Sequence, residues 1–189
     1  GCATIYPHEP KTDIQGAART IREFCTRYRI EVIAIGDGTA GRETWNFIQD
    51  LDLPCSISLV SVPEQGASIY SASELARSEL PGMDVTMRGA VSIGRRLLDP
   101  LAEMVKIEPR SIGVGQYQHD VDQTLLRGRL DEVVRSVVNE VGVDLNSASP
   151  SLLSYVSGLN PRLADAIVAY REKKGRFSNR EELRQVKGI

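Results

Sequence analysis

Histidine, cysteine and long apolar runs are scarce in this sequence. His8 and His119 are the only histidines among its 189 residues, which excludes a histidine-rich metal site. The three cysteines are odd in number and lack metal-binding spacing, so we expect reduced thiols. No apolar run approaches the roughly 18 residues of a membrane span. We therefore expect no metal, no cofactor and no membrane contact, and a location in the cytoplasm, or in the nucleus if the source is eukaryotic.

An initiator methionine is lacking as well. The chain opens on Gly1-Cys2-Ala3, in what looks like the middle of a structural element, and no signal-peptide pattern is present. We therefore expect a fragment of a longer protein, with further strands of its first domain upstream of Gly1.

Positive and negative charges are unevenly distributed along the chain. Residues 151–189 hold eight Lys and Arg against four Asp and Glu, whereas residues 1–150 hold 15 against 21, which together give the net charge of −2. An acidic body with a basic tail indicates that any polyanion contact is confined to the tail. The alternative is a solvated helical surface without a ligand.

The first half of the chain alternates between strand-like and helix-like segments. The apolar run 31–36 is typical of a strand buried on both faces, and a second strand is predicted over 57–62. A short strand is also predicted over 3–6, before an amphipathic helix over 14–28. This alternation predicts an α/β domain over residues 1–108.

The second half is predicted to be helical. Pro100 should break the helical pattern that runs from Met87 to Val105. We expect a connecting loop and a long helix over 109–142, followed by a small all-α domain over 143–189.

A glycine loop follows the first buried strand. Gly36-Asp37-Gly38-Thr39-Ala40-Gly41 matches the G-x-G-x-x-G pattern of dinucleotide-binding loops, and Glu64 lies further along the chain. However, an amphipathic helix precedes the loop, whereas this fingerprint normally opens its domain. A lone match is weak, so we favour a structural loop over a nucleotide site.

Two acidic residues are candidate metal ligands. Asp37 and Glu64 each follow a predicted strand, and open α/β sheets place their sites at the carboxyl ends of strands. Converging carboxylates can hold Mg²⁺ for phosphodiester cleavage. The alternative is that Asp37 is a turn residue and Glu64 a capping residue. A third ligand is missing, because Asp99 beside Pro100 is expected to mark a helix break.

The tail contains a helical hairpin. Ser149 is a helix-capping residue with Pro150 at the first helical position, and Gly158 provides a left-handed turn before a second helix. Such a turn can direct a helix N-terminus at a phosphate. The predicted nucleic-acid contacts are Gly158, Leu159, Asn160, Arg162, Lys173, Lys174 and Arg176.

The hairpin recurs within the tail. Leu153, Val156, Gly158 and Leu159 return thirty residues later as Leu183, Val186, Gly188 and Ile189. Ser178-Asn179-Arg180-Glu181 is a predicted capping box at the start of this second copy. The chain ends where the second hairpin is expected to turn.

Several runs in the tail carry a family resemblance: Val143-Asp144-Leu145-Asn146-Ser147-Ala148-Ser149, Val156-Ser157-Gly158-Leu159-Asn160, Ala164-Asp165-Ala166-Ile167-Val168, Tyr170-Arg171-Glu172-Lys173-Lys174-Gly175-Arg176-Phe177 and Glu182-Leu183. They resemble tandem helix-hairpin-helix modules of the DNA-uptake-protein type. That family's turn usually reads Gly-hydrophobic-Gly, and Asn160 takes the second Gly position here. Asn tolerates positive φ better than most residues, so we expect the turn to form.

Further runs extend the resemblance over the whole chain: Tyr6-Pro7-His8, Ile35-Gly36-Asp37-Gly38-Thr39-Ala40, Arg42-Glu43-Thr44, Glu64-Gln65-Gly66-Ala67-Ser68-Ile69-Tyr70-Ser71-Ala72-Ser73, Arg88-Gly89-Ala90-Val91-Ser92-Ile93, Asp99-Pro100-Leu101 and the loop 112–120. They resemble the Tex family of transcription accessory proteins. The resemblance implies a ribonuclease-H-like domain of the YqgF type followed by helix-hairpin-helix repeats.

The resemblance also bears on catalysis. YqgF resolvases carry three acidic residues, of which the first would precede Gly1 and the second corresponds to Glu64. Arg88 stands where the third is expected, and an arginine cannot ligate Mg²⁺ and would repel it. The resemblance therefore implies a nuclease fold without nuclease chemistry, with Asp37 and Glu64 as vestigial residues.

Three functional hypotheses follow. The first is sequence-nonspecific binding of RNA or DNA by a Tex-like transcription accessory protein that is not an enzyme. The second is a Mg²⁺-dependent nuclease or resolvase that uses Glu64. The third is a docking platform for the transcription machinery.

Overall fold

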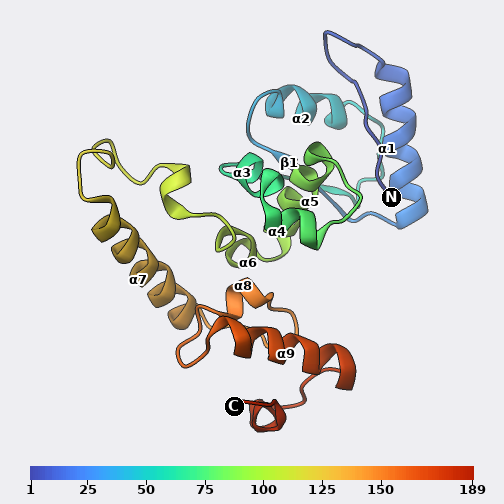
Figure 1. Ribbon diagram of the computed structural model, residues 1–189. Helices are drawn as coiled ribbons and strands as arrows, with labels where there is room; N and C mark the ends of the chain where they lie inside the picture. The colour runs from blue at the N-terminus through green and yellow to red at the C-terminus, as the bar shows by residue number, and fades with distance from the viewer. The chain divides into compact units, whose positions relative to one another are not determined.

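The computed structural model describes all 189 residues, and their contacts divide the chain into two compact units (Figure 1). Unit 1 covers Gly1–Leu98 and unit 2 covers Asp99–Ile189. The elements of unit 1 are α1 (Ile14–Tyr28), β1 (Val32–Gly36), α2 (Gly41–Gln49), β2 (Ser58–Val62), α3 (Ala67–Ala72), α4 (Glu74–Glu79) and α5 (Val85–Leu98). Those of unit 2 are α6 (Pro100–Met104), the 3₁₀ helix η1 (Pro109–Ile112), α7 (Gln123–Val141), α8 (Pro150–Leu153), α9 (Pro161–Lys174) and the 3₁₀ helix η2 (Arg180–Gln185).

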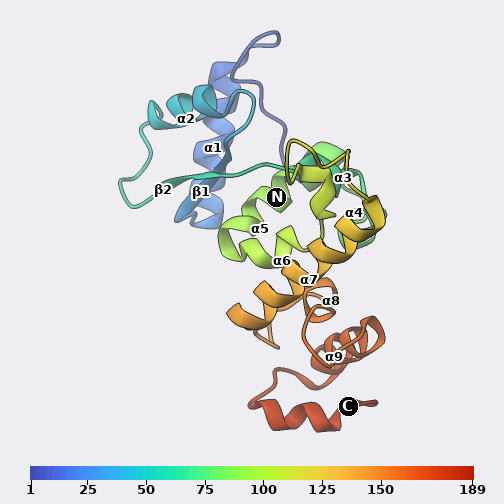
Figure 2. The same ribbon diagram turned by 90° about the vertical axis from the view of Figure 1, so that its left-hand side faces the viewer.

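Unit 1 is built on a two-stranded parallel sheet (Figure 2). Val32 pairs with Ser58 and Gly36 with Val62, so the carboxyl ends of both strands lie at the same edge. The prediction of a strand buried on both faces is wrong for β1: Ile35 is buried, but Val32 is 43% exposed. β1 pairs with β2 alone, so its apolar residues have neighbours on one edge only. The predicted strand over 3–6 is also absent.

The helices of unit 1 begin and end as local chemistry requires. Asp13 caps α1 by accepting a hydrogen bond from the Gly16 amide at 2.8 Å. Ser73, which directly follows α3, caps α4 by accepting a hydrogen bond from the Ala76 amide. α5 packs along α3 and β1, where Tyr70 of α3 is 1% exposed. The predicted α/β class is confirmed for this unit.

Unit 2 is all-helical around one apolar core, and the predicted class is confirmed here too. Pro100 does break the helix, since Asp99 accepts a hydrogen bond from the Ala102 amide and starts α6. The core is formed by the buried residues Val138, Ala148, Leu152, Leu153, Ala164, Ile167, Phe177 and Val186. Val138 is one turn from the end of α7, so this long helix shares its core with the hairpin helices α8 and α9. None of the helices in either unit is both long and apolar enough to cross a lipid bilayer.

Candidate nucleic-acid interface

The two hairpins of unit 2 repeat the same backbone geometry. In the first, the Val156 amide donates to Leu153 O and the Leu159 amide to Val156 O. In the second, Val186 donates to Leu183 O and Ile189 to Val186 O. Gly158 and Gly188 both have positive φ, at +86° and +104°. Only glycine adopts this conformation without a steric penalty, which confirms the repeat predicted from the sequence.

The first hairpin presents unused backbone donors. Gly158, Asn160 and Arg162 have amides without a hydrogen-bond partner in the protein, at the point where α9 begins. Pro161 occupies the first helical position, where an N–H group would have no partner within the helix. Free amides at a helix N-terminus form a binding site for an anion, and the Arg162 side chain adds a positive charge.

Asn160 has a different role from the one its sequence suggested. Its φ is −125°, so it does not take the left-handed conformation expected from the Gly-hydrophobic-Gly comparison. Its side chain instead caps α9 by accepting a hydrogen bond from the Leu163 amide at 3.0 Å. Gly158 alone makes the left-handed turn, because the next residues must return to extended backbone before a helix can start.

Asn139 of α7 holds the first hairpin in place. Its Nδ2 donates to the carbonyl of Tyr155 at 2.9 Å, and its Oδ1 accepts from the Ser157 amide at 2.8 Å. One side-chain amide thus satisfies two backbone groups of the loop that directly precedes Gly158. The sequence pattern did not indicate this contact, since Asn139 reads as one polar residue on a solvated helix face.

Tyr155 adds a second contact between α7 and the hairpin. The guanidinium of Arg135 lies 5.7 Å from the centre of its ring. Burial raises the pKa of the Tyr155 hydroxyl, and the negative charge of Asp131 raises it further. The hydroxyl is therefore neutral at physiological pH. Through Asn139 and Arg135, α7 contacts both ends of the loop 155–157.

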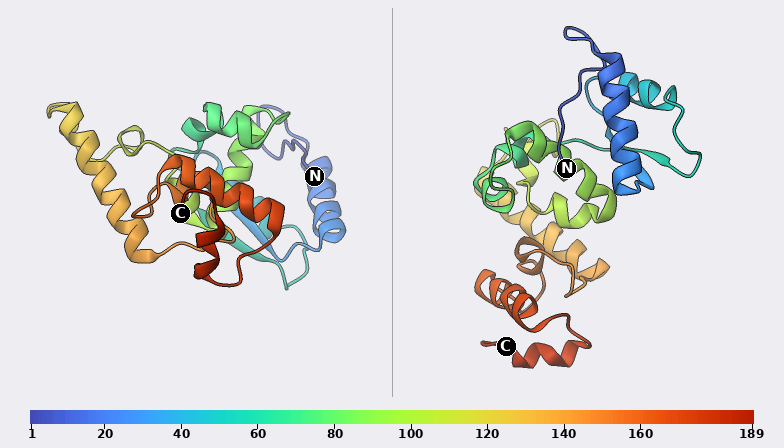
Figure 3. Two further views of the ribbon diagram at one scale, coloured as in Figure 1. Left: turned by 60° about the horizontal axis from the view of Figure 1, so that its bottom comes forward. Right: turned by 90° about the vertical axis from the view of Figure 1, so that its right-hand side faces the viewer.

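The second hairpin folds back to the start of α9. A Cβ built on Gly188 would lie only 3.0 Å from a methyl group of Leu163, and the Tyr170 hydroxyl donates to Gln185 at 2.8 Å. Figure 3 shows η2 next to α9 and running across its direction. Lys187 is exposed next to this turn, so it belongs to the same end of α9 as Arg162. The sequence analysis did not identify Lys187. In the thirty-residue repeat, Lys187 occupies the position in the second hairpin that Ser157 occupies in the first.

The other predicted contacts lie at the opposite end of α9. Lys173 and Lys174 are exposed in its last turn, and Arg176 is exposed two residues after it. Eleven residues of helix separate Arg162 from Lys173, a distance of about 16 Å. The structure therefore brings Gly158, Leu159, Asn160 and Arg162 together and separates them from the three distal cations.

The start of the second repeat is held by Asn146. Its Nδ2 donates to Phe177 O at 3.0 Å, and its Oδ1 accepts from the Phe177 amide at 2.8 Å. Phe177 stacks on Tyr170, with ring centres 5.2 Å apart. The next helical turn is capped by Asn179, while Glu182 accepts from the Ser178 amide, which shifts the predicted capping box by one residue.

Asp37 and Glu64 do meet at the carboxyl edge of the sheet in unit 1. Asp37 accepts a hydrogen bond from the Glu64 amide at 3.0 Å, and its own amide donates to Val62 O. The Glu64 carboxylate lies against the glycine loop: a Cβ on Gly36 would be 2.8 Å from Glu64 Oε2, and a Cβ on Gly38 would overlap its Oε1. The glycines of this loop thus make room for the Glu64 carboxylate.

The predicted metal pair has no third carboxylate. No group of three His, Cys, Asp or Glu side chains is placed to hold a metal ion anywhere in the chain. Asp99 caps α6, as expected of a helix-break residue. Arg88 is 7% exposed on α5, and its Nη1 is buried without a hydrogen-bond partner. Two turns later, Arg96 donates to Pro63 O and Gln65 O and so fixes the backbone on both sides of Glu64.

Comparison with known proteins assigns both units. A family profile described as the Tex protein YqgF-like domain matches residues 1–98, which is more than half of the chain. The chain belongs to the Tex family. A second profile, the helix-hairpin-helix motif, matches residues 138–189 and so includes the turn of α7 that carries Asn139. Membership of the Tex family confirms the resemblance drawn from the sequence.

Relatives of the Tex family come from bacteria and animals. The chain is 54% identical over 189 residues to "Protein tex" of Bordetella pertussis and 52% identical over 185 residues to "Transcriptional accessory protein Tex" of Neisseria gonorrhoeae, with 97% and 96% of the chain covered. It is 49% identical over 177 residues to human "S1 RNA-binding domain-containing protein 1", with 91% covered. These alignments span 24%, 24% and 18% of the relatives' own lengths, so the chain corresponds to about a quarter of a bacterial Tex protein.

Proposed function

We propose that this chain is a nucleic-acid-binding part of a Tex-type transcription accessory protein, and that it contacts the phosphate backbone of RNA or DNA without reading its sequence. The observation that carries the proposal is the pair of hairpins at one end of α9. Unused amides of Gly158, Asn160 and Arg162 lie there, together with the exposed cation of Lys187. The printed names of the Neisseria and human relatives, which refer to transcription and to RNA binding, support it.

The hairpin end can bind phosphate by two effects. Backbone amides and the helix dipole of α9 favour a negative charge at its N-terminus. Arg162 and Lys187 each neutralise a phosphate and release its counterions, which makes binding depend on salt. Neither effect reads a base edge, so contacts of this kind position a nucleic acid without specifying its sequence. Lys173, Lys174 and Arg176 remain predicted flanking contacts for a strand that continues along α9.

We also propose that unit 1 does not cleave nucleic acid. Asp37 uses one carboxylate oxygen on the Glu64 amide, and the Glu64 carboxylate rests against Gly36 and Gly38. A two-metal hydrolytic site needs more carboxylate ligands than this pair supplies. The acidic edge then has a structural role, in which it joins the two strand ends. The proposed role in transcription places the protein in the cytoplasm of a bacterium or in the nucleus of a eukaryote.

Binding is tested with fluorescein-labelled 20-mers, single- and double-stranded, by fluorescence anisotropy across a salt series. The 189-residue chain is expected to bind at low salt. The logarithm of its association constant is expected to fall linearly with the logarithm of the salt concentration, and the slope of that line is the salt slope. Arg162→Gln is expected to reduce the slope by about 0.7 to 0.9, the contribution of one phosphate contact. Asp165→Asn, an exposed position on the same helix, is the control and should not weaken binding. Absence of binding at low salt would refute the proposal.

Two further experiments separate the other hypotheses. Mg²⁺-dependent cleavage of branched DNA that disappears in Glu64→Gln would overturn the absence of nuclease chemistry. A docking platform predicts that transcription proteins remain bound to the chain after nuclease treatment, and that the Arg162→Gln variant captures them equally well. Capture that depends on intact nucleic acid supports the binding function instead.

A further inference from the structure

Unit 1 carries a group of four exposed arginines, three on α1 and one at its C-cap, Arg29. Arg19, Arg22, Arg27 and Arg29 are all exposed, and none of them forms an ion pair. Elsewhere in the unit, Arg77 pairs with Glu74 and Arg95 with Glu79, while Arg88 and Arg96 are buried on α5. Arg42 and Lys11 are the other exposed cations of the unit that form no ion pair. Lys11 lies over the ring of Tyr6, and Arg27 over the ring of Tyr28.

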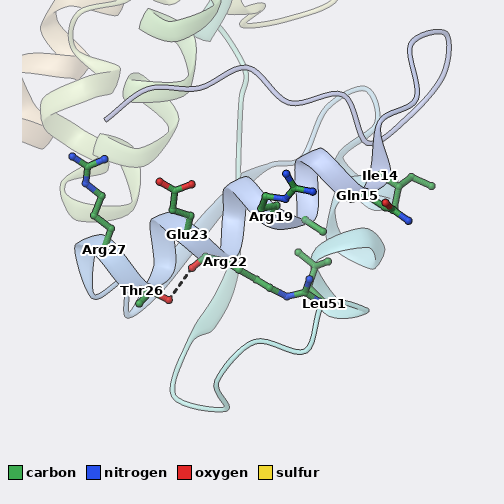
Figure 4. Close-up of a pocket in the computed structure, with 9 residues that line it drawn as sticks. Ile14, Gln15, Arg19, Arg22, Glu23, Thr26, Arg27 and Leu51 are labelled. Atoms are coloured by element: carbon green, nitrogen blue, oxygen red, sulfur yellow. Dashed lines mark hydrogen bonds between the residues drawn. The ribbon is translucent and has the colours of Figure 1, made fainter.

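The arginines line an elongated hollow. One part, of about 970 Å³, lies between Arg19, Arg22, Arg27 and Leu51 (Figure 4). A second part, of about 550 Å³, continues past Arg29 along the loop between α2 and β2. Arg22 and Thr26 line both parts, so the two hollows adjoin. From Arg19 to Arg29 the helix axis covers about 15 Å, which is long enough for several phosphates of a nucleic-acid strand.

The floor of this hollow is apolar and small. Ala18 is buried beneath it, and Ile14 and Leu51 form its side, with Ile14 54% exposed. In Figure 4 the Arg22 side chain extends across the hollow toward Leu51. A positively charged groove that follows the phosphate backbone is one feature of sequence-independent single-strand binding, and the second feature, aromatic side chains that stack on the bases, is absent from the lining of this hollow. Guanidinium groups also match phosphate oxygens in pairs, which a lysine cannot do.

We propose that the α1 surface, defined as Arg19, Arg22, Arg27 and Arg29, is a second contact for the phosphodiester backbone of a nucleic-acid strand. This inference rests on the proposed nucleic-acid-binding function but assigns it to a unit outside the hairpins. An acidic peptide would be attracted by the same charges. It would also need deep pockets for its anchoring side chains, whereas this hollow is open and shallow. Three carboxylates also border the hollow, Glu23 of α1 in its first part and Glu31 and Asp52 in its second.

The test compares two double variants of the whole chain with equal loss of charge. Arg19→Gln/Arg22→Gln removes two cations of the α1 surface, and Arg127→Gln/Arg129→Gln removes two exposed cations of α7 as the control. Binding of a labelled 20-mer single strand is measured across a salt series. If each arginine holds one phosphate, the α1 variant is expected to lower the slope by about 1.4 and the affinity about 25-fold at 0.1 M salt. The control is expected to change neither by a comparable amount.

Each outcome has a separate meaning. An α1 variant with unchanged slope and affinity overturns the inference, while binding that still depends on Arg162 leaves the proposed function intact. Absence of binding by the parent chain at low salt refutes the proposed function itself. Polyglutamate is titrated in parallel: if the α1 variant loses polyglutamate binding but keeps the oligonucleotide, the surface belongs to an acidic protein and the inference is wrong. A melting temperature equal to that of the parent shows that the exposed substitutions leave the fold unchanged.

Discussion

Asn139 allows the role of a rigid hairpin to be measured. Asn139→Ala removes a hydrogen bond from Nδ2 to Arg135 O within α7 and the two that join α7 to the hairpin, from Nδ2 to Tyr155 O and from the Ser157 amide to Oδ1. Each is worth about 0.5 to 1.5 kcal/mol, and all three lie at an exposed position where water replaces part of the loss. We therefore expect a destabilisation of about 1 to 2 kcal/mol.

The same free energy should appear in binding. With the clamp removed, the loop 155–157 samples other conformations, and a strand must select the one in which the Gly158 and Asn160 amides face outward. A cost of one to two kcal/mol corresponds to a roughly 5- to 30-fold weaker affinity. The salt slope should not change, because every cation remains in place. A reduced affinity at constant slope is thus the signature of lost preorganisation.

The control for this prediction lies at the other end of the same helix. Asp122 also makes two hydrogen bonds to backbone amides, those of Thr124 and Leu125, about 25 Å from Asn139 along α7. Asp122→Ala should lower stability by about 0.5 to 2 kcal/mol without weakening binding. The reasoning is refuted if Asn139→Ala and Asp122→Ala lower the melting temperature alike and both leave the affinity unchanged.

Three other perturbations have expected outcomes. Gly41→Ala would bring a Cβ within 2.5 Å of Gly36 O, so it should lower the free energy of unfolding of unit 1 in urea by about 1 to 3 kcal/mol. Gly94→Ala, at a position in α5 with open space around it, should raise this free energy by about 0.5 to 1 kcal/mol. Hydrogen bonds from the backbone N–H of Asn146 and the hydroxyl of Ser147 lower the pKa of Asp144. The stability that they provide is therefore present above about pH 4 and is lost as the pH falls through the folded-state pKa. In Asp144→Asn the melting temperature should fall less steeply with decreasing pH than in the parent chain, and an equally steep fall would contradict this. Lys187→Gln should reduce the salt slope of nucleic-acid binding by about 0.7 to 0.9, and an unchanged slope would exclude the second hairpin from the interface.

Much of unit 2 could be predicted because its signals are local. Ser149, Pro150 and Gly158 each satisfy a requirement of one helix end, and such requirements involve residues only a few positions apart. The thirty-residue repeat likewise needs no partner to be recognised. The role of Asn160 was misjudged because a turn position and a capping position both favour asparagine, and only the backbone dihedral angles distinguish them.

The sequence by itself determined the class of each unit, the two hairpins, the helix break at Pro100 and the family to which the chain belongs. The tertiary structure decided which groups meet. It placed Asn139 on the first hairpin, brought Gly188 to Leu163 and set the Glu64 carboxylate against Gly36. These contacts join residues 18 to 28 positions apart. Local propensities extend over one or two turns only, so contacts at such separations depend on how the helices pack.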